Sequence, residues 1–308
     1  MPTVRFEQLF DPDFSKASAR NQIDAALNLI EEVRNYGLWL FARCSNRPEG
    51  GDENLAILSL YYHLIEMLDA IGVLIEECTA APARLQLRAI FETLLGIEFI
   101  LQADTVRRAH AYLVVDILNR IEFYETLDSG TEAGRLFQIA IASDPDCSRM
   151  RLPSPKREAI ANLKRDLTAP LFAEAFMEYQ SASRRHLEWY QLFGGPNDLR
   201  ELAKRVKHEG AYEILYGGLS QTEHATDVIQ RNIVDKGGRP AVRPIRSSLE
   251  MSTIVTLAVN FAIQATRLMI RRYRPGEEAR FHEWNTSEIS NLWRAVASGA
   301  ALARPLSS

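Results

Sequence analysis

The sequence predicts an all-α protein, a single multi-helix and bundle-like domain with a long apolar central helix near the C-terminus. The first observation is that apolar residues recur at three- and four-residue spacings through most of the chain, which is the helical period. The second is that no segment alternates apolar and polar residues over a convincing strand length. Internal repeats and low-complexity tracts are also absent from the sequence, and we expect one domain over residues 1–308.

In the first half of the chain, an irregular arm is expected over residues 1–14. A turn is expected over 46–52, where the sequence reads NRPEGGD. The segment 53–77 is so rich in apolar residues that most of its helix should be buried. The helices expected in this half are, in order, 15–42, 53–77, 84–103 and 105–127.

The second half is more interrupted. We expect a short helix and then a flexible loop over 128–153, a helix from Ser154 that breaks before Pro170, and an aromatic segment over 186–195. The later helices are expected at 171–183, 198–208, 211–227, 248–273 and from Asn285 onward, with residues 300–308 frayed. The expected caps are Asn197 and the pairs Ser247/Glu250 and Asn285/Glu288, with Gly210 as a stop signal.

The composition limits the class of protein. Hydrophobic residues at 46% and charged residues at 25% are ordinary for a soluble globular protein. The net charge of -4 argues against a general nucleic-acid or anionic-membrane binder. Only 16 uncharged residues separate Glu250 from Arg267, which is short for a bilayer span of about 20 apolar residues, so no membrane segment is expected. Three distant cysteines and the lack of a secretory apolar region favour a cytoplasmic protein with reduced thiols.

A ladder of polar side chains marks the most informative helix. Tyr212, Tyr216, Ser220 and His224 follow one another at four-residue steps, and residues four apart lie on one face of a helix. Gly217 and its neighbour Gly218 fall inside this ladder. Because glycine weakens a helix interior, we expect a local break there, or a close approach by another backbone or a ligand.

A second pair of polar residues lies in the apolar helix 84–103. Arg88 and Glu92 are four residues apart among large apolar neighbours, which leaves little wet surface for two charges. We expect an ion pair that faces an internal cleft and meets the ladder, although a solvated surface pair is the alternative. In this interpretation the helices 84–102, 211–227 and 248–273 form the interior.

Several known chemistries lack their signatures. Glu66 and Asp69 are three apart and could share a metal with Glu92 and His224, but the chain has no Glu-x-x-His pair, HExxH or Cys/His cluster. No metal and no cofactor is therefore expected. Phosphate-binding glycine loops, GxSxG and the Arg-x(4–6)-His pattern of helical defence ribonucleases are also absent. His224 as a hydrogen-bonding residue that holds helices together, or as a general base with Ser220 as nucleophile, both stay open.

Three segments carry a resemblance to a known family. They are ARLQLRAIFETLLGIEFIL at 83–101, the pair Trp189-Tyr190, and LRELAKRVKHEGAYEILYGGLSQTEHA at 199–225. Together they resemble a bacterial all-helical family of unknown function, over a core of about residues 55–275. The resemblance implies a helical fold and a polar centre at Arg88, Glu92, Tyr212, Tyr216, Ser220 and His224. The glycines at 217–218 stand where the family pattern has an arginine-like residue.

Two functions follow as expectations. The first is a non-catalytic helical binding or regulatory protein of a bacterial stress or phage-defence system, whose partner is an unknown small molecule or protein. A homodimer is compatible with this expectation. The second is an enzyme that acts on a small polar or phosphorylated substrate. Its catalytic residues would be His224 as general acid/base with Glu92 and Ser220, and Arg88, Tyr212 and Tyr216 would bind the substrate.

Overall fold

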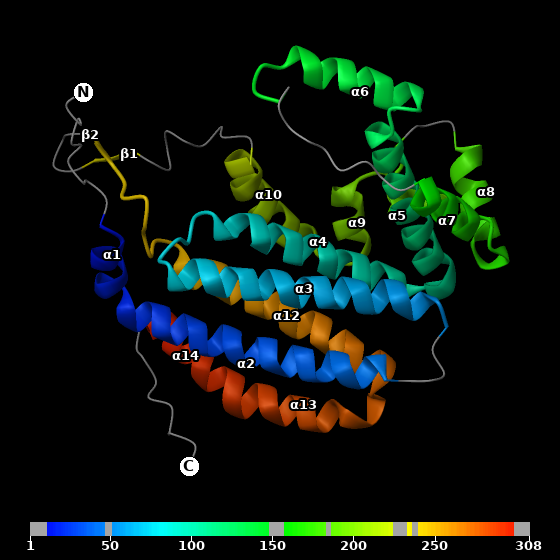
Figure 1. Cartoon of the computed structure of the whole chain (residues 1–308). Helices are drawn as coiled ribbons and strands as arrows, with labels where there is room; N and C mark the ends of the chain where they lie inside the picture. Colours follow the sequence, from blue (N-terminus) through cyan, green and yellow to red (C-terminus); the bar gives the residue numbers. More distant parts are fainter. Residues whose placement is uncertain are drawn as a thin grey trace, which may run out of the picture. The chain divides into compact units, whose positions relative to one another are not determined.

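The computed structural model shows an all-α, multi-helix protein, as the sequence predicts (Figure 1). The structure describes residues 11–46, 51–147, 157–182, 186–223, 233–235 and 240–298. The chain divides into two compact units. Unit 1 comprises residues 1–50, 57–98 and 199–308, and unit 2 comprises 51–56 and 99–198. The expectation of one domain over 1–308 stays a prediction.

Unit 1 contains the helices that matter most for the candidate site. The long ones are α2 (Arg20–Ser45), α3 (Glu53–Glu76), α4 (Ala83–Gln102) and α12 (Met251–Tyr273). The shorter ones are α1 (Pro12–Ser18), α9 (Leu199–Arg205), α10 (Glu209–Glu223), the 3-10 turn η3 (Pro275–Glu277), α13 (Glu278–Trp284), the π-helical turn η4 (Asn285–Ile289) and α14 (Ser290–Ser298). The first turn of α3 and the last turn of α4 lie across the boundary with unit 2.

The core of unit 1 is built around α12, whose inward face is almost entirely apolar and buried. The helix packs against α2 along its length. Phe261 of α12 meets Phe91 of α4 with ring centroids 5.1 Å apart. A polar contact in this core pairs two buried hydroxyls, Tyr61 of α3 and Thr266 of α12, at 2.9 Å. A buried hydroxyl without a partner would cost free energy, so this pair removes a penalty from the interior.

The N-terminal region differs from the sequence prediction. The arm expected over 1–14 already contains the start of α1, because Asp11 caps that helix by accepting bonds from the backbone N–H groups of Asp13 and Phe14. The single helix expected over 15–42 is divided at Ala19, where the backbone leaves helical geometry. Residues 1–10 lie outside the described residues.

Three expected helix ends are also wrong. Glu250 has a φ of 68° and makes no side-chain cap on α12, because its carboxylate pairs with Arg84 instead. Asn285 does not begin a separate helix: α13 continues through η4 into α14. Gly210 is in the first turn of α10 and ends no helix. The tail expected to fray lies outside the described residues.

Unit 2 is a smaller helical cluster. Its elements are α5 (Thr105–Leu127), α6 (Glu132–Ser143), α7 (Arg157–Leu167), the 3-10 turn η1 (Pro170–Phe172), α8 (Ala173–Ser181) and the 3-10 turn η2 (Trp189–Gly194). Its core residues come from α5, α7 and α8 and are Val114, Ile117, Ile121, Leu163, Leu167 and Ala175. Trp189 packs its ring against Tyr112 of α5 and Phe99 at the end of α4.

A small antiparallel ribbon was not predicted. β1 (Ile233–Asp235) pairs with β2 (Pro240–Val242), with Ile233 opposite Val242. In addition, Thr79 and Ser247 form an isolated parallel bridge. Strands of three residues are too short to show an alternating pattern, so no periodicity predicted them.

Two helices, α3 and α12, are long and apolar enough to cross a membrane by length and composition alone. This is weak evidence for a span, because the core helix of a soluble protein passes the same test. Both helices contribute many fully buried side chains to unit 1.

Candidate functional site

The candidate site lies along the contact between α4 and α10, which we call the α4–α10 seam and define by Arg88, Glu92, Glu98, His208, Tyr212 and Tyr216. On α4, Arg88 and Glu92 are one turn apart, so their side chains meet. The Arg88 Nε donates to Glu92 Oε1 at 2.6 Å. Their side chains are 25% and 37% exposed. The predicted ion pair is therefore present and is partly shielded from water.

Tyr216 of α10 joins this pair. Its hydroxyl donates to Glu92 Oε1 and accepts a bond from Arg88 Nε at 3.0 Å. The Arg88 guanidinium carbon also lies 4.6 Å from the centre of the Tyr216 ring, which is a cation–π contact. The predicted meeting of the Arg88/Glu92 pair with the ladder is confirmed at Tyr216. The three side chains form a closed triangle of hydrogen bonds.

Tyr212 lies one turn before Tyr216 on α10. The two rings are stacked, with centroids 4.3 Å apart and planes 11° from parallel. Helix α10 runs through Gly217 and Gly218 without interruption, so the expected break is wrong. A Cβ added at Gly217 would meet no protein atom within 4 Å, so a close approach by another backbone does not explain that glycine either.

The electrostatics of the triangle fix its protonation. Burial, and then the hydrogen bond to Glu92, raise the pKa of the Tyr216 hydroxyl far above its usual value of 10.0. Burial of Arg88 works against its cation, but the bond to Glu92 and the nearby Tyr216 outweigh this effect and raise the pKa of the guanidinium. At neutral pH Tyr216 is therefore a neutral donor and Arg88 a fixed cation.

Ser220 and His224 are the upper rungs of the ladder. The backbone of Ser220 belongs to α10, four residues after Tyr216, but its side chain is not among those described. His224 lies outside the described residues. The expectation that this helix forms part of the interior is wrong for its described side chains, because Leu215 is the buried one and Ile214 is 72% exposed.

Sequence reasoning missed one pair in the seam. His208 Nε2 lies 2.9 Å from Glu98 Oε2, and both side chains are less than one-fifth exposed. The backbone carbonyl of His208 also accepts the N–H of Tyr212 as α10 begins. A signal existed, because His208 stands four residues before Tyr212 and so extends the four-residue ladder downward. The seam therefore brings two acid–base pairings to one helix contact.

The seam lies within the segment that matches a known family model. That model is described as a family of unknown function (DUF5677), and it matches residues 54–240. The chain belongs to this family. No curated protein and no solved structure matches the chain. All of the seam residues fall within the family segment, which α12 to α14 do not.

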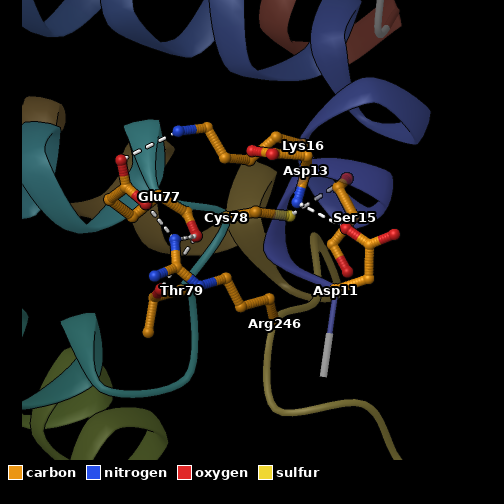
Figure 2. Close-up of polar contacts among 8 residues, drawn as sticks. All are labelled: Asp11, Asp13, Ser15, Lys16, Glu77, Cys78, Thr79 and Arg246. Atoms are coloured by element: carbon orange, nitrogen blue, oxygen red, sulfur yellow. Dashed lines mark hydrogen bonds and ion pairs between the residues drawn. The ribbon is translucent and has the colours of Figure 1, made fainter. Parts of the chain in front are cut away.

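A second polar cluster in this family member ties three distant segments together (Figure 2). Glu77, just after α3, accepts a bond from Lys16 Nζ of α1 at 2.9 Å and pairs with Arg246, which follows β2. These two hydrogen bonds lower the pKa of the Glu77 carboxyl. Arg246 also donates to the Glu77 backbone carbonyl at 2.7 Å. The cluster therefore holds α1 and the segment after β2 against the end of α3, which is a structural role.

The neighbouring thiol in Figure 2 belongs to Cys78, which is buried and has a φ of 54°. Burial raises the pKa of this thiol, so it is a poor nucleophile at neutral pH. Among the described residues, no group of three or more His, Cys, Asp or Glu side chains could hold a metal ion. Asp69, considered as a ligand from sequence, forms an ion pair with Arg34 at 2.6 Å.

Proposed function

We propose that this chain is a non-catalytic helical binding or regulatory protein whose α4–α10 seam holds the fold in place. The observation that carries the proposal is the closed triangle of Arg88, Glu92 and Tyr216, in which the polar groups satisfy one another. A catalytic acid or base needs a pKa near the working pH and access to the substrate proton. Tyr216 has a strongly raised pKa, so it keeps its proton and donates it in a hydrogen bond to Glu92.

Exposed apolar side chains support the binding part of the proposal. In unit 1, Ile214 projects from α10 at 72% exposure, next to the seam in sequence. In unit 2, the amphipathic helix α6 buries only Gly134 and exposes Leu136 at 62% and Ile139 at 64%. Contiguous exposed apolar surface in a soluble protein commonly marks a contact with a partner. The partner proposed is a small molecule or another protein, and a homodimer fits the same surfaces.

The setting proposed for this role is the cytoplasm of a bacterium, in a stress or phage-defence response. Cells that carry the gene are expected to resist phage or stress better than cells without it. The measurement is the plating efficiency of a phage panel on both strains. Equal plating and equal stress survival would remove the setting but would leave the structural role of the seam unaffected.

The non-catalytic role is tested with the variant His224→Ala. If the histidine only holds helices together, its loss lowers the melting temperature, and cellular protection falls with the folded fraction. Glu92→Gln serves as a second variant, because it keeps the shape of a described seam residue while it removes the charge. A variant that melts like the wild type and yet abolishes protection would contradict the proposal.

The enzymatic alternative is favoured by one observation, the shielded His208–Glu98 pair, since an imidazole oriented by a carboxylate is a common general base. In this alternative the chain acts on a small polar or phosphorylated substrate, with His224 as general acid/base. A screen of phosphate esters for product release, with His224→Ala beside the wild type, tests it. Turnover that disappears in the variant without a change in melting temperature would establish this alternative.

A further inference from the structure

A groove runs between α12 and the continuous helix α13–η4–α14 in unit 1. Two adjoining hollows make it up, with volumes of about 520 and 410 Å³. Arg267 and Asn285 line both hollows, so the two form one groove that is centred on these residues. Pockets of this size hold small organic ligands.

One wall of the groove is a single stripe of α12. Asn260, Ile263, Arg267 and Arg271 face it, and their spacing of three to four residues keeps them on one side of the helix. The stripe is roughly 16 Å long from Asn260 to Arg271 at the rise of an α-helix. Ile263 is 5% exposed and forms part of the floor, whereas both arginines are exposed at the rim.

The opposite wall contains the π-helical turn η4. Phe281, Asn285, Ile289 and Trp293 all line the groove and are four residues apart. In a regular α-helix, steps of four residues overshoot a turn by about 40° each, so such a row would drift off the wall. The wider π turn takes up an extra residue and reduces this drift. π-helical turns are rare in proteins, and those that do occur are often found at functional sites.

The charges in the groove select the ligand. Arg267, Arg271 and Arg294 line it together with His282, and Glu278 is the one acid among its lining residues. Glu278 offsets Arg271 only weakly, because the two groups are 3.9 Å apart. Arginine guanidinium groups bind phosphate oxygens through paired, charge-assisted hydrogen bonds. The groove therefore suits a compact ligand with several phosphate charges.

The remaining lining residues suit a planar ring. Trp293 supplies an aromatic face beside Arg294, and the carboxamides of Asn260 and Asn285 can each donate and accept hydrogen bonds. Stacking on an aromatic side chain together with bonds to ring edges is how proteins hold nucleobases. The net charge of -4 on the whole chain disfavours a long polyanion and favours a small one.

From these contacts we propose that the groove between α12 and α13–η4–α14 binds a free nucleoside triphosphate. Arg267 and Arg271 hold the phosphates, and Trp293 with the two asparagines holds the base. This site goes beyond the proposed function and does not depend on it, because no groove residue belongs to the α4–α10 seam. The groove helices also lie outside the segment shared with the family. Nucleotide sensing would be a property of this C-terminal region.

The test is isothermal titration calorimetry of the full chain with ATP and GTP, and with tripolyphosphate, adenosine and a short uridine oligomer as comparison ligands. The variant Arg267→Gln removes the cation shared by both hollows, and Arg294→Gln removes one from a single hollow. Arg135→Gln is the matched control, because it removes an equal charge from an exposed position on α6. Circular dichroism of each variant verifies that it is folded.

We expect ATP or GTP to bind the wild type, and Arg267→Gln to weaken that binding by about tenfold or more, as the loss of a charge-assisted phosphate contact does. Arg135→Gln should leave the affinity within about twofold, since surface charges away from a site act weakly through screening. The proposal is overturned if neither nucleotide binds at millimolar concentration, if Arg267→Gln binds as well as the wild type, or if tripolyphosphate binds as tightly as the nucleotide. Tighter binding of the uridine oligomer than of either nucleotide would also overturn it, in favour of a nucleic-acid site.

Discussion

Replacing Tyr216 by phenylalanine is the most direct test of the seam. The change removes a hydroxyl that donates to Glu92 and accepts from Arg88, and it keeps the aromatic ring. The cation–π contact with Arg88 and the stacking on Tyr212 should therefore survive. Any loss of stability reports on the hydroxyl alone.

The magnitude follows from the exposure of the partners. A hydrogen bond to a charged group contributes about 1.5–3 kcal/mol when it is buried. Glu92 is 37% exposed and keeps its bond to Arg88, so water and the arginine can replace part of what is lost. We therefore expect Tyr216→Phe to lower the free energy of unfolding by about 1 kcal/mol, which is below the range for a buried bond. The double variant with Glu92→Gln should show a coupling of about 0.5–1 kcal/mol, as contacting residues do.

The assay is chemical denaturation of the wild type, both single variants and the double variant, followed by circular dichroism. Tyr62→Phe is the matched control, because the Tyr62 side chain is exposed and its hydroxyl should contribute little. A coupling energy between Tyr216 and Glu92 below about 0.3 kcal/mol would mean that the two residues act as independent sites. That result, with Tyr216→Phe no different from Tyr62→Phe, would show that the triangle does not hold α10 against α4.

Other predictions concern the second polar cluster and two glycines. The lowered pKa of Glu77 gives stability that is present above the unfolded value of 4.5 and is lost as pH falls through the folded pKa. Glu77→Gln should therefore lose less stability on acidification below about pH 4.5 than the wild type, and identical acid melting curves would contradict this. Gly217→Ala should stabilise the protein by up to about 1 kcal/mol, because its Cβ meets no atom within 4 Å. Gly134→Ala should destabilise it by about 1–3 kcal/mol, since its Cβ would lie 1.9 Å from the Asp128 carbonyl oxygen. Equal shifts of the denaturation midpoint in the two alanine variants would refute the steric reasoning.

The sequence was a good guide to long helices and a poor one to their ends. The helix expected over 105–127 is α5 with the same bounds, and α3 and α12 end within a residue of the expected positions. A long stripe of apolar residues at helical spacing predicts a helix, whichever element that helix packs against. Helix caps are harder to predict, because a polar side chain can bond either to the backbone at its own helix end or to a residue far away in the sequence. Glu250 is such a case: it bonds to Arg84, 166 residues away, and leaves α12 uncapped.

In the α4–α10 seam, too, some contacts could be predicted from the sequence and others could not. Four-residue spacing alone placed Arg88 beside Glu92, and Tyr212 beside Tyr216, because neighbours on one helix face are fixed by the helical period. The four-residue step to Tyr212 indicated His208 itself, but no spacing indicated that it pairs with Glu98, since the two residues are 110 positions apart in the sequence. The π turn at Asn285 also followed from no pattern that the sequence offers.

By itself, the sequence determined that this protein is helical, which faces of its longest helices are apolar, and which polar side chains share a face. Only the tertiary structure decided that Tyr216 is the rung that closes on Arg88 and Glu92, and that three arginines gather along one groove beside α12. The reason is that side-chain periodicity is a local property of one helix. The meeting of two helices depends on their angle and distance, which residues far apart in the chain set together.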